Sequence, residues 1–337
     1  MNSKDVKEQQ GISRREFIAG AAAVGASLLF SKSAFGLMSP IPKDAMAEVL
    51  SLKASPGGTF RILVVTDLHF YANHLVDAET VRDIKNMVRK FKPDLIIPTG
   101  DNWHNNPGGH GIEFCEYACE QMGKMKAPWA FVWGNHDQVD DYDMAHKMIR
   151  EANNSLYRGG AADGNYRLEL KDASGEKTLW NLIMLNDSRG GMRDEQIDWL
   201  KKEAAAIKSA SLQPPPAFLF FHIPIKQYDD LAKSGHAKGM KMENVSYDES
   251  INNALSAFSE TGFVKAAFCG HDHVNNYWGV QGGVFLEYAR ATGSGGYGHD
   301  RCKKGGTIID MNTATGEFKT TTVFADGSTW EPKVFIG

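Results

Sequence analysis

The stretch FRILVVTDLH, residues 60–69, decides the fold. It begins with apolar and β-branched residues in a run of the length of one buried strand. It ends on two polar side chains, Asp67 and His69. Polar and charged groups are costly to bury unless they are paired or bind a metal ion. The stretch therefore predicts a buried strand that leads into a polar site.

Four further apolar segments carry polar side chains at or near their ends: Asp101 after 95–100, Asn135 and His136 in 128–137, His222 in 214–224, and His271 and His273 in 264–273. Ligands of open α/β sheets bind at the carboxyl ends of the strands. Since residues two apart on a strand point to one side, we expect His271 and His273 to face together and Asp272 to face away. The same spacing predicts that Asp67 and His69 face together.

Helical patterns alternate with these strands. Apolar residues recur at helical spacing in several segments: 77–91, 111–125, 141–153, 193–210 and 249–262. Further strand patterns complete the chain: 165–172, 178–187, 282–290, 305–312 and 317–324. This order predicts an α/β domain with mixed sheets.

The polar residues at the strand ends amount to two carboxylates, one amide oxygen and four imidazoles: Asp67, His69, Asp101, Asn135, His222, His271 and His273. Taken alone, the two histidines of GHDH (270–273) fit a hydrogen-bonded polar cluster as well as a metal site. Five strand ends of this kind together favour the metal site. The set suits two divalent or trivalent ions, because imidazoles bind borderline metals and a carboxylate can bridge two ions.

In this order, the blocks DLH, GDN, GNHD, H and GHDH resemble the calcineurin-like metallophosphoesterase superfamily, over about Thr59 to Asp310. Details such as PWAFVWGNHDQ and GHDHVNN are similar to its small purple-acid-phosphatase-like branch. The resemblance implies a four-layer αββα sandwich, in which two mixed sheets pack face to face with helices outside.

The resemblance also implies roles for these residues. The first metal ion would bind to four residues: Asp67, His69, Asp101 and His273. The second would bind to Asp101, Asn135, His222 and His271. Asp101 would thus bridge the ions, and His136 would act on the substrate as an acid or a stabiliser of the transition state. Purple acid phosphatases have a metal-binding tyrosine three residues after the bridging aspartate, where this chain has His104, so the metals (Fe, Mn or Zn) stay open.

The implied function is hydrolysis of a small phosphoester by two metal ions and a hydroxide that bridges them. A phosphomonoesterase is the first interpretation. A phosphodiesterase acting on cyclic nucleotides or phospholipid-like diesters is the alternative, and a protein that binds metal or phosphate without turnover is the alternative outside enzymes. Asp101 and His136 are the expected catalytic residues.

Three residues are candidates for substrate contacts: His104, His236 and Arg290, the last of which would otherwise form a salt bridge. We expect Asp137 and Asp272 to hold loops or orient ligands. Asp187 is either structural or lines the cleft. The loop GSGGYGHD, residues 293–300, fits a glycine-rich turn better than a phosphate-binding loop. The remaining histidines noted here are expected on the surface: His74, His110 and His146.

The first 36 residues predict an exported protein, and the composition is typical of a soluble globular protein. Residues 1–36 contain Arg14 and Arg15 before a short apolar stretch, which predicts a twin-arginine export signal and a periplasmic or otherwise exported protein. That stretch is too short to span a membrane. Residues 37–57 are predicted to be a linker and residues 58–337 the metallophosphoesterase domain. The formal charge of −4, with no basic block, predicts no nucleic-acid partner. The four cysteines are expected mainly as small apolar residues, and one disulfide between them stays open.

Overall fold

The protein folds around two mixed β-sheets. The structure, a computed structural model, describes residues 48–71, 75–248 and 253–337. The five-stranded sheet has the order β13-β12-β11-β2-β3. Its strands are β2 (Thr59–Val65), β3 (Leu95–Pro98), β11 (Gly306–Asn312), β12 (Glu317–Val323) and β13 (Thr329–Trp330). β2 pairs in parallel with β3 and antiparallel with β11, so the sheet is mixed.

The nine-stranded sheet has the order β1-β4-β5-β6-β8-β10-β9-β7-β14. Its strands are β1 (Leu50–Lys53), β4 (Tyr166–Lys171), β5 (Thr178–Met184), β6 (Ala217–Phe220), β7 (Lys238–Met240), β8 (Val264–Cys269), β9 (Asn276–Gln281), β10 (Val284–Tyr288) and β14 (Phe335–Ile336). The central strands β5, β6, β8 and β10 run parallel, and β4 and β9 join them antiparallel.

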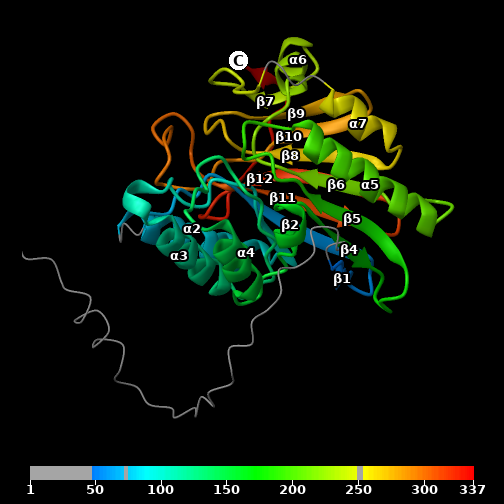
Figure 1. Cartoon of the computed structure of the whole chain (residues 1–337). Helices are drawn as coiled ribbons and strands as arrows, with labels where there is room; N and C mark the ends of the chain where they lie inside the picture. The colour runs from blue at the N-terminus through cyan, green and yellow to red at the C-terminus, as the bar shows by residue number, and fades with distance from the viewer. Residues whose placement is uncertain (1–47, 72–74, 249–252) are drawn as a thin grey trace, which may run out of the picture. The chain divides into compact units, whose positions relative to one another are not determined.

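Helices flank the two sheets, as predicted (Figure 1). They are α2 (Val76–Phe91), α3 (Gly111–Gly123), α4 (Tyr142–Glu151), α5 (Asp194–Ala210), α6 (Gln227–Lys233) and α7 (Ala254–Glu260), with short 3₁₀ turns at Pro107–Gly109 and Gly159–Ala162. In Figure 1, α2, α3 and α4 lie beside β2, whereas α5 and α7 lie against the nine-stranded sheet. No helix in the described ranges is both long and apolar enough to span a membrane.

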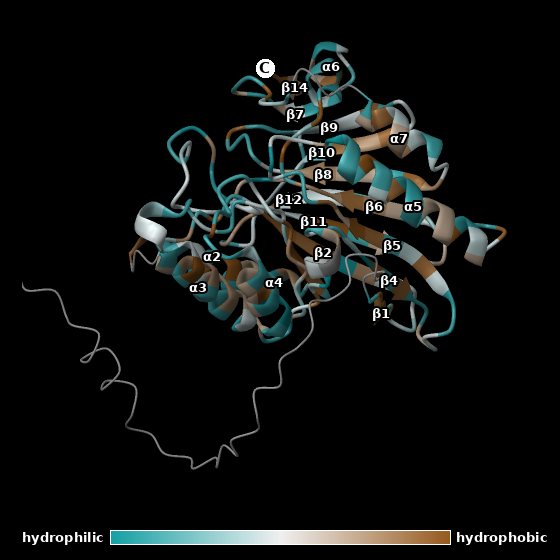
Figure 2. Cartoon of the chain, viewed as in Figure 1, coloured by the Kyte–Doolittle hydropathy of each residue, from teal (hydrophilic) through white to brown (hydrophobic). Residues whose placement is uncertain are grey.

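Alternating side chains on the central strands build two cores. On β6, Phe218 and Phe220 pack into the core between the sheets, where the Phe218 ring lies 4.9 Å from that of Phe318 on β12. Leu219, and Phe221 directly after the strand, point the other way into the core under α5 and α7. A strand buried on both faces reads as a continuous apolar run. Figure 2 shows this as brown along β5 and β6, in contrast to the hydrophilic outer surface of α5.

Two predictions about elements are wrong. β1 (Leu50–Lys53), which pairs in parallel with β4, lies within the predicted linker 37–57, so part of that segment belongs to the sheet. Residues 128–137 run beside β3 but form only isolated bridges, through Trp129 and Val132. Pro98 at the end of β3 has no N–H to donate, which weakens a continuous ladder there. The predictions for residues 1–47, including the export signal, lie outside the described residues.

The structure also tests the predicted positions of the surface histidines and the cysteines. His146 is buried, with its Nδ1 2.6 Å from the hydroxyl of Tyr157, so its predicted surface position is wrong. His110 is exposed, as predicted, and His74 lies outside the described residues. All four cysteines are buried and free, so the structure has no disulfide between them.

Candidate metal centre

The candidate site lies just beyond the carboxyl ends of four strands. β2 ends at Val65, two residues before Asp67, and β3 ends at Pro98, three residues before Asp101. Both aspartates have left-handed backbone, with φ of 56° and 51°. The side chains are therefore aimed by tight turns after the strands. Strand alternation, the reason given for a common direction of Asp67 and His69, does not operate there, because β2 ends before both residues.

The same holds for two of the four histidines of the site. His69 has φ of 48° and His271 has φ of 81°, again in the left-handed region. L-residues adopt this region rarely, and such strain concentrates at functional sites. The loops after β2, β3, β6 and β8 thus turn their polar side chains toward one place.

Four residues form what we call the first ligand group: Asp67, His69, Asp101 and His273. All four are buried, and one ligand atom from each lies within 4.8 Å of the others. The Nε2 atoms of His69 and His273 are 3.1 Å apart. His273 Nε2 lies 3.3 Å from an Asp67 carboxylate oxygen, and His69 Nε2 lies 3.7 Å from Asp101 Oδ2. This is the set that the family resemblance implied for one metal ion.

The second ligand group consists of Asp101, His222 and His271, whose ligand atoms again lie within 4.8 Å of one another. His222 Nε2 is 3.1 Å from Asp101 Oδ2 and 3.3 Å from His271 Nδ1. Asp101 therefore belongs to both groups. The amide oxygen of Asn135, predicted as the fourth ligand here, is buried and has no hydrogen-bond partner among the described residues.

The surroundings of His222 fit a bound cation. The Nδ1 of His222 lies 2.9 Å from the carbonyl of Thr99, which can only accept, so Nδ1 carries the proton. In the neutral ring the lone pair of Nε2 then faces another acceptor, Asp101 Oδ2. Burial alone would lower the pKa of His222, but the carboxylates of Asp101 and Asp67 outweigh it and raise that pKa to about 10. A bound metal ion would supply the positive charge that these converging acceptors require.

A family comparison agrees with this geometry. Residues 60–275 match the model of the family described as calcineurin-like phosphoesterase. The chain belongs to that family. The match contains every residue of both ligand groups.

Curated relatives and a solved structure are similar over most of the chain. Probable inactive purple acid phosphatases 28 and 29 of Arabidopsis thaliana are 28% and 27% identical to it, over 79% and 82% of both chains. A crystal structure of a dimetal phosphatase from Danio rerio superposes with a TM-score of 0.56 at 11% identity, covering 79% of this chain and 95% of that one. At that identity the likeness concerns the fold alone.

Asp187 supports the backbone beside a ligand residue, His222. Asp187 accepts hydrogen bonds from the backbone N–H groups of His222 and Ile223, both at 3.0 Å. Burial raises the pKa of Asp187 to about 7, and the neighbouring His222 opposes this rise. Of the two roles left open for Asp187, the structure supports the structural one, since it fixes the backbone of a ligand residue.

Asp137 and Asp272 hold loops, as predicted. Asp137 accepts from the backbone N–H of Asn102 at 2.6 Å and from that of Gly134 at 2.7 Å, which ties the loop after β3 to the next one. Asp272 accepts from the N–H of Ser246 at 3.1 Å and from the Tyr288 hydroxyl at 2.5 Å. Neither carboxylate belongs to a ligand group, so both act through the backbone that carries the ligands.

Two further histidines stand beside the ligand groups. His136 is partly exposed, with its Nε2 3.9 Å from Asp101 Oδ2, and its backbone N–H donates to Asp101 Oδ1 at 2.8 Å. Its Nδ1 lies 2.8 Å from the side-chain oxygen of Asn105. The ring of His104 lies parallel to that of His136, at 8° and 5.7 Å, and the Nδ1 atoms of His104 and His69 are 3.4 Å apart. Sequence reasoning missed Asn105, because it belongs to none of the motif blocks.

The other two predicted substrate contacts, Arg290 and His236, belong to neither ligand group. Arg290 is buried. Its guanidinium contacts Cys302 Sγ, donates to the Asn276 side chain at 3.1 Å and lies over the Trp330 ring. These interior partners contradict the predicted phosphate contact. His236 is exposed in the loop between α6 and β7, outside both ligand groups, and its substrate contact stays a prediction.

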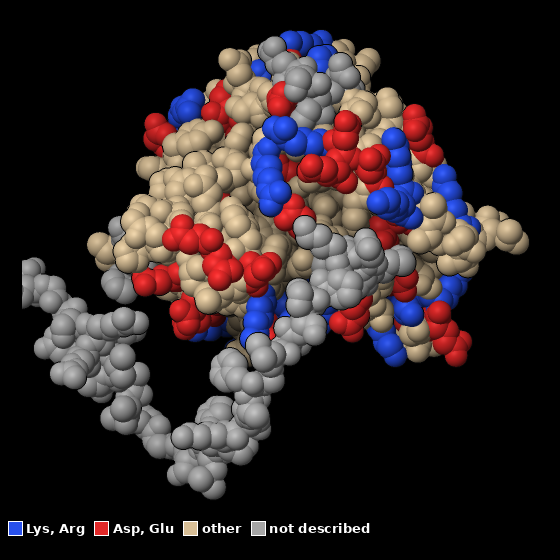
Figure 3. All heavy atoms as spheres, in the orientation of Figure 1, with Lys and Arg blue, Asp and Glu red and all other residues tan. Residues whose placement is uncertain are grey.

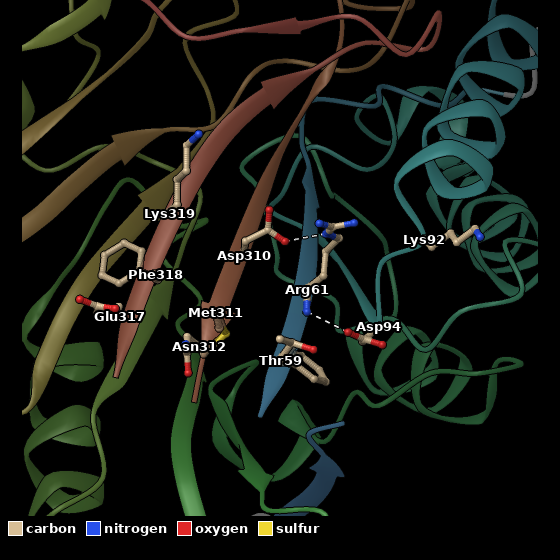
Figure 4. A pocket seen from close by; sticks show the side chains of 11 residues that line it. Thr59, Arg61, Lys92, Asp94, Asp310, Met311, Asn312, Glu317, Phe318 and Lys319 are labelled. Carbon is tan, nitrogen blue, oxygen red and sulfur yellow. Dashed lines mark hydrogen bonds and ion pairs between the residues drawn. The ribbon is translucent and has the colours of Figure 1, made fainter. Parts of the chain in front are cut away.

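A cavity of about 790 Å³ lies elsewhere on the molecule (Figure 4). It is lined by the amino-terminal end of β2, where Arg61 Nε donates to Asp310 at 2.6 Å and Arg61 N donates to Asp94 at 2.8 Å. The ligand groups follow the opposite end of the same strand. The cavity is therefore separate from the candidate metal centre.

Proposed function

We propose that the protein is a phosphomonoesterase that uses two metal ions. The observation that carries the proposal is the place of Asp101, whose carboxylate belongs to both ligand groups. A shared carboxylate holds two ions close enough to act on one phosphoryl group. Some relatives are named probable inactive phosphatases, so the proposed activity rests on the residues of this chain.

The residues that would hold the metals are those of the two ligand groups, with Asn135 completing the second. The orphaned amide oxygen of Asn135 supports this assignment, since buried polar atoms normally have a partner. Ions bound there would activate water and neutralise charge on the phosphoryl oxygens. Fe, Mn and Zn all suit this mixture of imidazole and carboxylate ligands.

His136 is positioned to handle a proton. The side-chain oxygen of Asn105 accepts from Nδ1–H of His136, and this leaves Nε2 free toward the site. In its doubly protonated form, a histidine held in this way can donate the Nε2 proton to the departing oxygen of the substrate. Asp101 fixes the backbone of His136, so the proton donor and the ligand groups are linked through one carboxylate.

The proposed preference for monoesters rests on the resemblance of the sequence to the purple-acid-phosphatase-like branch. Phosphodiesterase activity on cyclic nucleotides or phospholipid-like diesters is the second candidate, since both reactions use the same ligand groups. Figure 3 shows acidic and basic side chains interspersed on one face of the molecule, without a continuous basic surface there. This distribution gives no reason to prefer a nucleic-acid substrate.

The test is hydrolysis of p-nitrophenyl phosphate and of bis-p-nitrophenyl phosphate by protein loaded with Mn²⁺, Zn²⁺ or iron. We expect turnover with at least one metal and a higher kcat/KM for the monoester. A higher kcat/KM for the diester would replace the phosphatase by the phosphodiesterase. Absence of turnover for protein shown to bind two metals would favour a binding protein.

We also propose that residues 1–36 direct export of the folded protein by the twin-arginine route, so that the export machinery is a partner. The support is the sequence alone, in particular the pair Arg14 and Arg15 before the apolar stretch. The double substitution Arg14→Lys and Arg15→Lys should retain the protein in the cytoplasm in cell fractionation. Unchanged export of the double variant would contradict the route.

A further inference from the structure

The glycine-rich loop between β10 and β11 lies directly against the first ligand group. A Cβ atom added to Gly296 would lie 2.4 Å from Cε1 of His273, and one added to Gly295 would lie 2.8 Å from the carbonyl oxygen of His69. Real side chains do not approach so closely. These glycines therefore allow the backbone of the loop to pack on two ligand histidines, a role that the motif GSGGYGHD alone did not reveal.

Tyr297, the next residue of the loop, covers the ring of His273. The two rings are nearly parallel, at 11°, with their centroids 4.0 Å apart. The Tyr297 hydroxyl accepts from the backbone N–H of His273 at 3.2 Å and donates to Glu243 at 2.9 Å. Glu243 also accepts from the N–H of Val274 at 3.0 Å. The tyrosine ring is thus fixed at its hydroxyl end while it packs on the ligand.

The backbone of Tyr297 sets the tautomer of the same histidine. Its carbonyl oxygen lies 3.3 Å from His273 Nδ1 and can only accept, so Nδ1 carries the proton. The lone pair of Nε2 is then directed to Asp67 and His69, as metal binding requires. Lys304 donates to this carbonyl at 2.6 Å and anchors the loop in place.

We propose that the loop segment Gly295–Tyr297 is a positioning clamp for His273, and that it sets the metal affinity of the first ligand group. Substitution of groups that orient a metal ligand typically changes metal affinity 10–100-fold. His273 belongs only to the first ligand group, so the clamp should act on one of two ions. The inference rests on the proposed function only in taking the ligand groups as metal sites.

The experiment measures metal binding, without reference to turnover. Wild type, Tyr297→Leu and the control Tyr142→Leu are titrated with Zn²⁺ against a chromophoric chelator, and bound zinc is counted. Tyr142 is a matched control because it is 41% exposed, against 47% for Tyr297, and belongs to neither ligand group. We expect two tight sites in wild type and in the control. In Tyr297→Leu we expect one site weakened 10–100-fold and the other within threefold of wild type.

Unchanged affinities in Tyr297→Leu would overturn the clamp, and so would equal weakening of both sites, which indicates a general structural role. If Tyr297→Leu does not fold, Tyr297→Phe decides the matter. That variant keeps the stacked ring but loses the hydroxyl bonds, so it should weaken the same single site about 10-fold, at the lower end of the range for such orienting groups. An unchanged Tyr297→Phe would then overturn the inference. Tight binding of two ions without hydrolysis of any phosphoester would refute the proposed function and leave the clamp intact.

Discussion

A buried glutamate between the two sheets gives a sharp prediction about stability. Glu287 on β10 is 1% exposed and shares a face of its strand with Phe285, whose ring lies 5.5 Å from that of Phe318 on β12. Burial raises the pKa of Glu287 from its ordinary value of 4.5 to about 8, although Thr320 on β12 acts in the opposite direction. The side chain is therefore protonated in the folded protein at neutral pH.

The sign of the effect follows from the raised pKa. Between about pH 4.5 and 8, the folded state keeps the proton that the unfolded state has lost, so the free energy of unfolding falls as the pH rises. Each pH unit in this window costs about 1.4 kcal/mol. From pH 5.5 to 7.5 the wild type should therefore lose about 2–3 kcal/mol through Glu287 alone.

The substitution Glu287→Gln removes this ionisation and nearly keeps the shape. The difference in the free energy of unfolding, variant minus wild type, should rise by about 2–3 kcal/mol between the two pH values. Tm by scanning calorimetry should show a relative gain of about 5 °C in the variant at pH 7.5. Glu116→Gln, at an exposed position of α3, is the control and should show no such gain. A difference between Glu287→Gln and wild type that does not change with pH would refute the reasoning.

Three further substitutions test the candidate metal centre. Asn135→Ala removes the unpaired amide oxygen and should weaken one of two Zn²⁺ sites about 10-fold or more in a chelator competition; two unchanged sites would exclude Asn135 as a ligand. His136→Ala should lower kcat by about 10²–10⁴ while zinc content stays at the wild-type value, and a kcat within threefold of wild type would contradict its role as proton donor. Gly100→Ala should lower the free energy of unfolding by about 2 kcal/mol or more in a denaturant titration. Gly100 has φ of 89°, and its Cβ would lie 2.4 Å from the His222 ring, so wild-type stability would show that this approach is not tight.

The sequence was sufficient to predict the layers of the fold and the members of the two ligand groups. Short apolar runs such as 217–220 and 264–269 are strands in the structure, and the polar residues after them lie together because parallel strands end at one edge. The order of the motif blocks then identified Asp101 as the shared residue. These signals are local in the chain, and each depends on few residues.

Features that depend on distant partners were not predictable in this way. Arg290 is a plausible surface cation in the sequence, and only the fold brings Cys302, Asn276 and Trp330 around it. His146 is buried because Tyr157, 11 residues later, offers it a hydroxyl. The left-handed turns at Asp67 and Asp101 carry non-glycine residues, so no glycine marks them in the sequence.

The central claim is that Asp101 joins two metal ions in one catalytic site. It is tested most directly by measuring phosphomonoesterase rate against equivalents of bound metal, for wild type and for Asp101→Ala. We predict that the wild-type rate rises with metal up to two ions per chain. We predict that Asp101→Ala binds fewer than two ions tightly and loses nearly all activity. A full wild-type rate in Asp101→Ala would contradict the two-metal account.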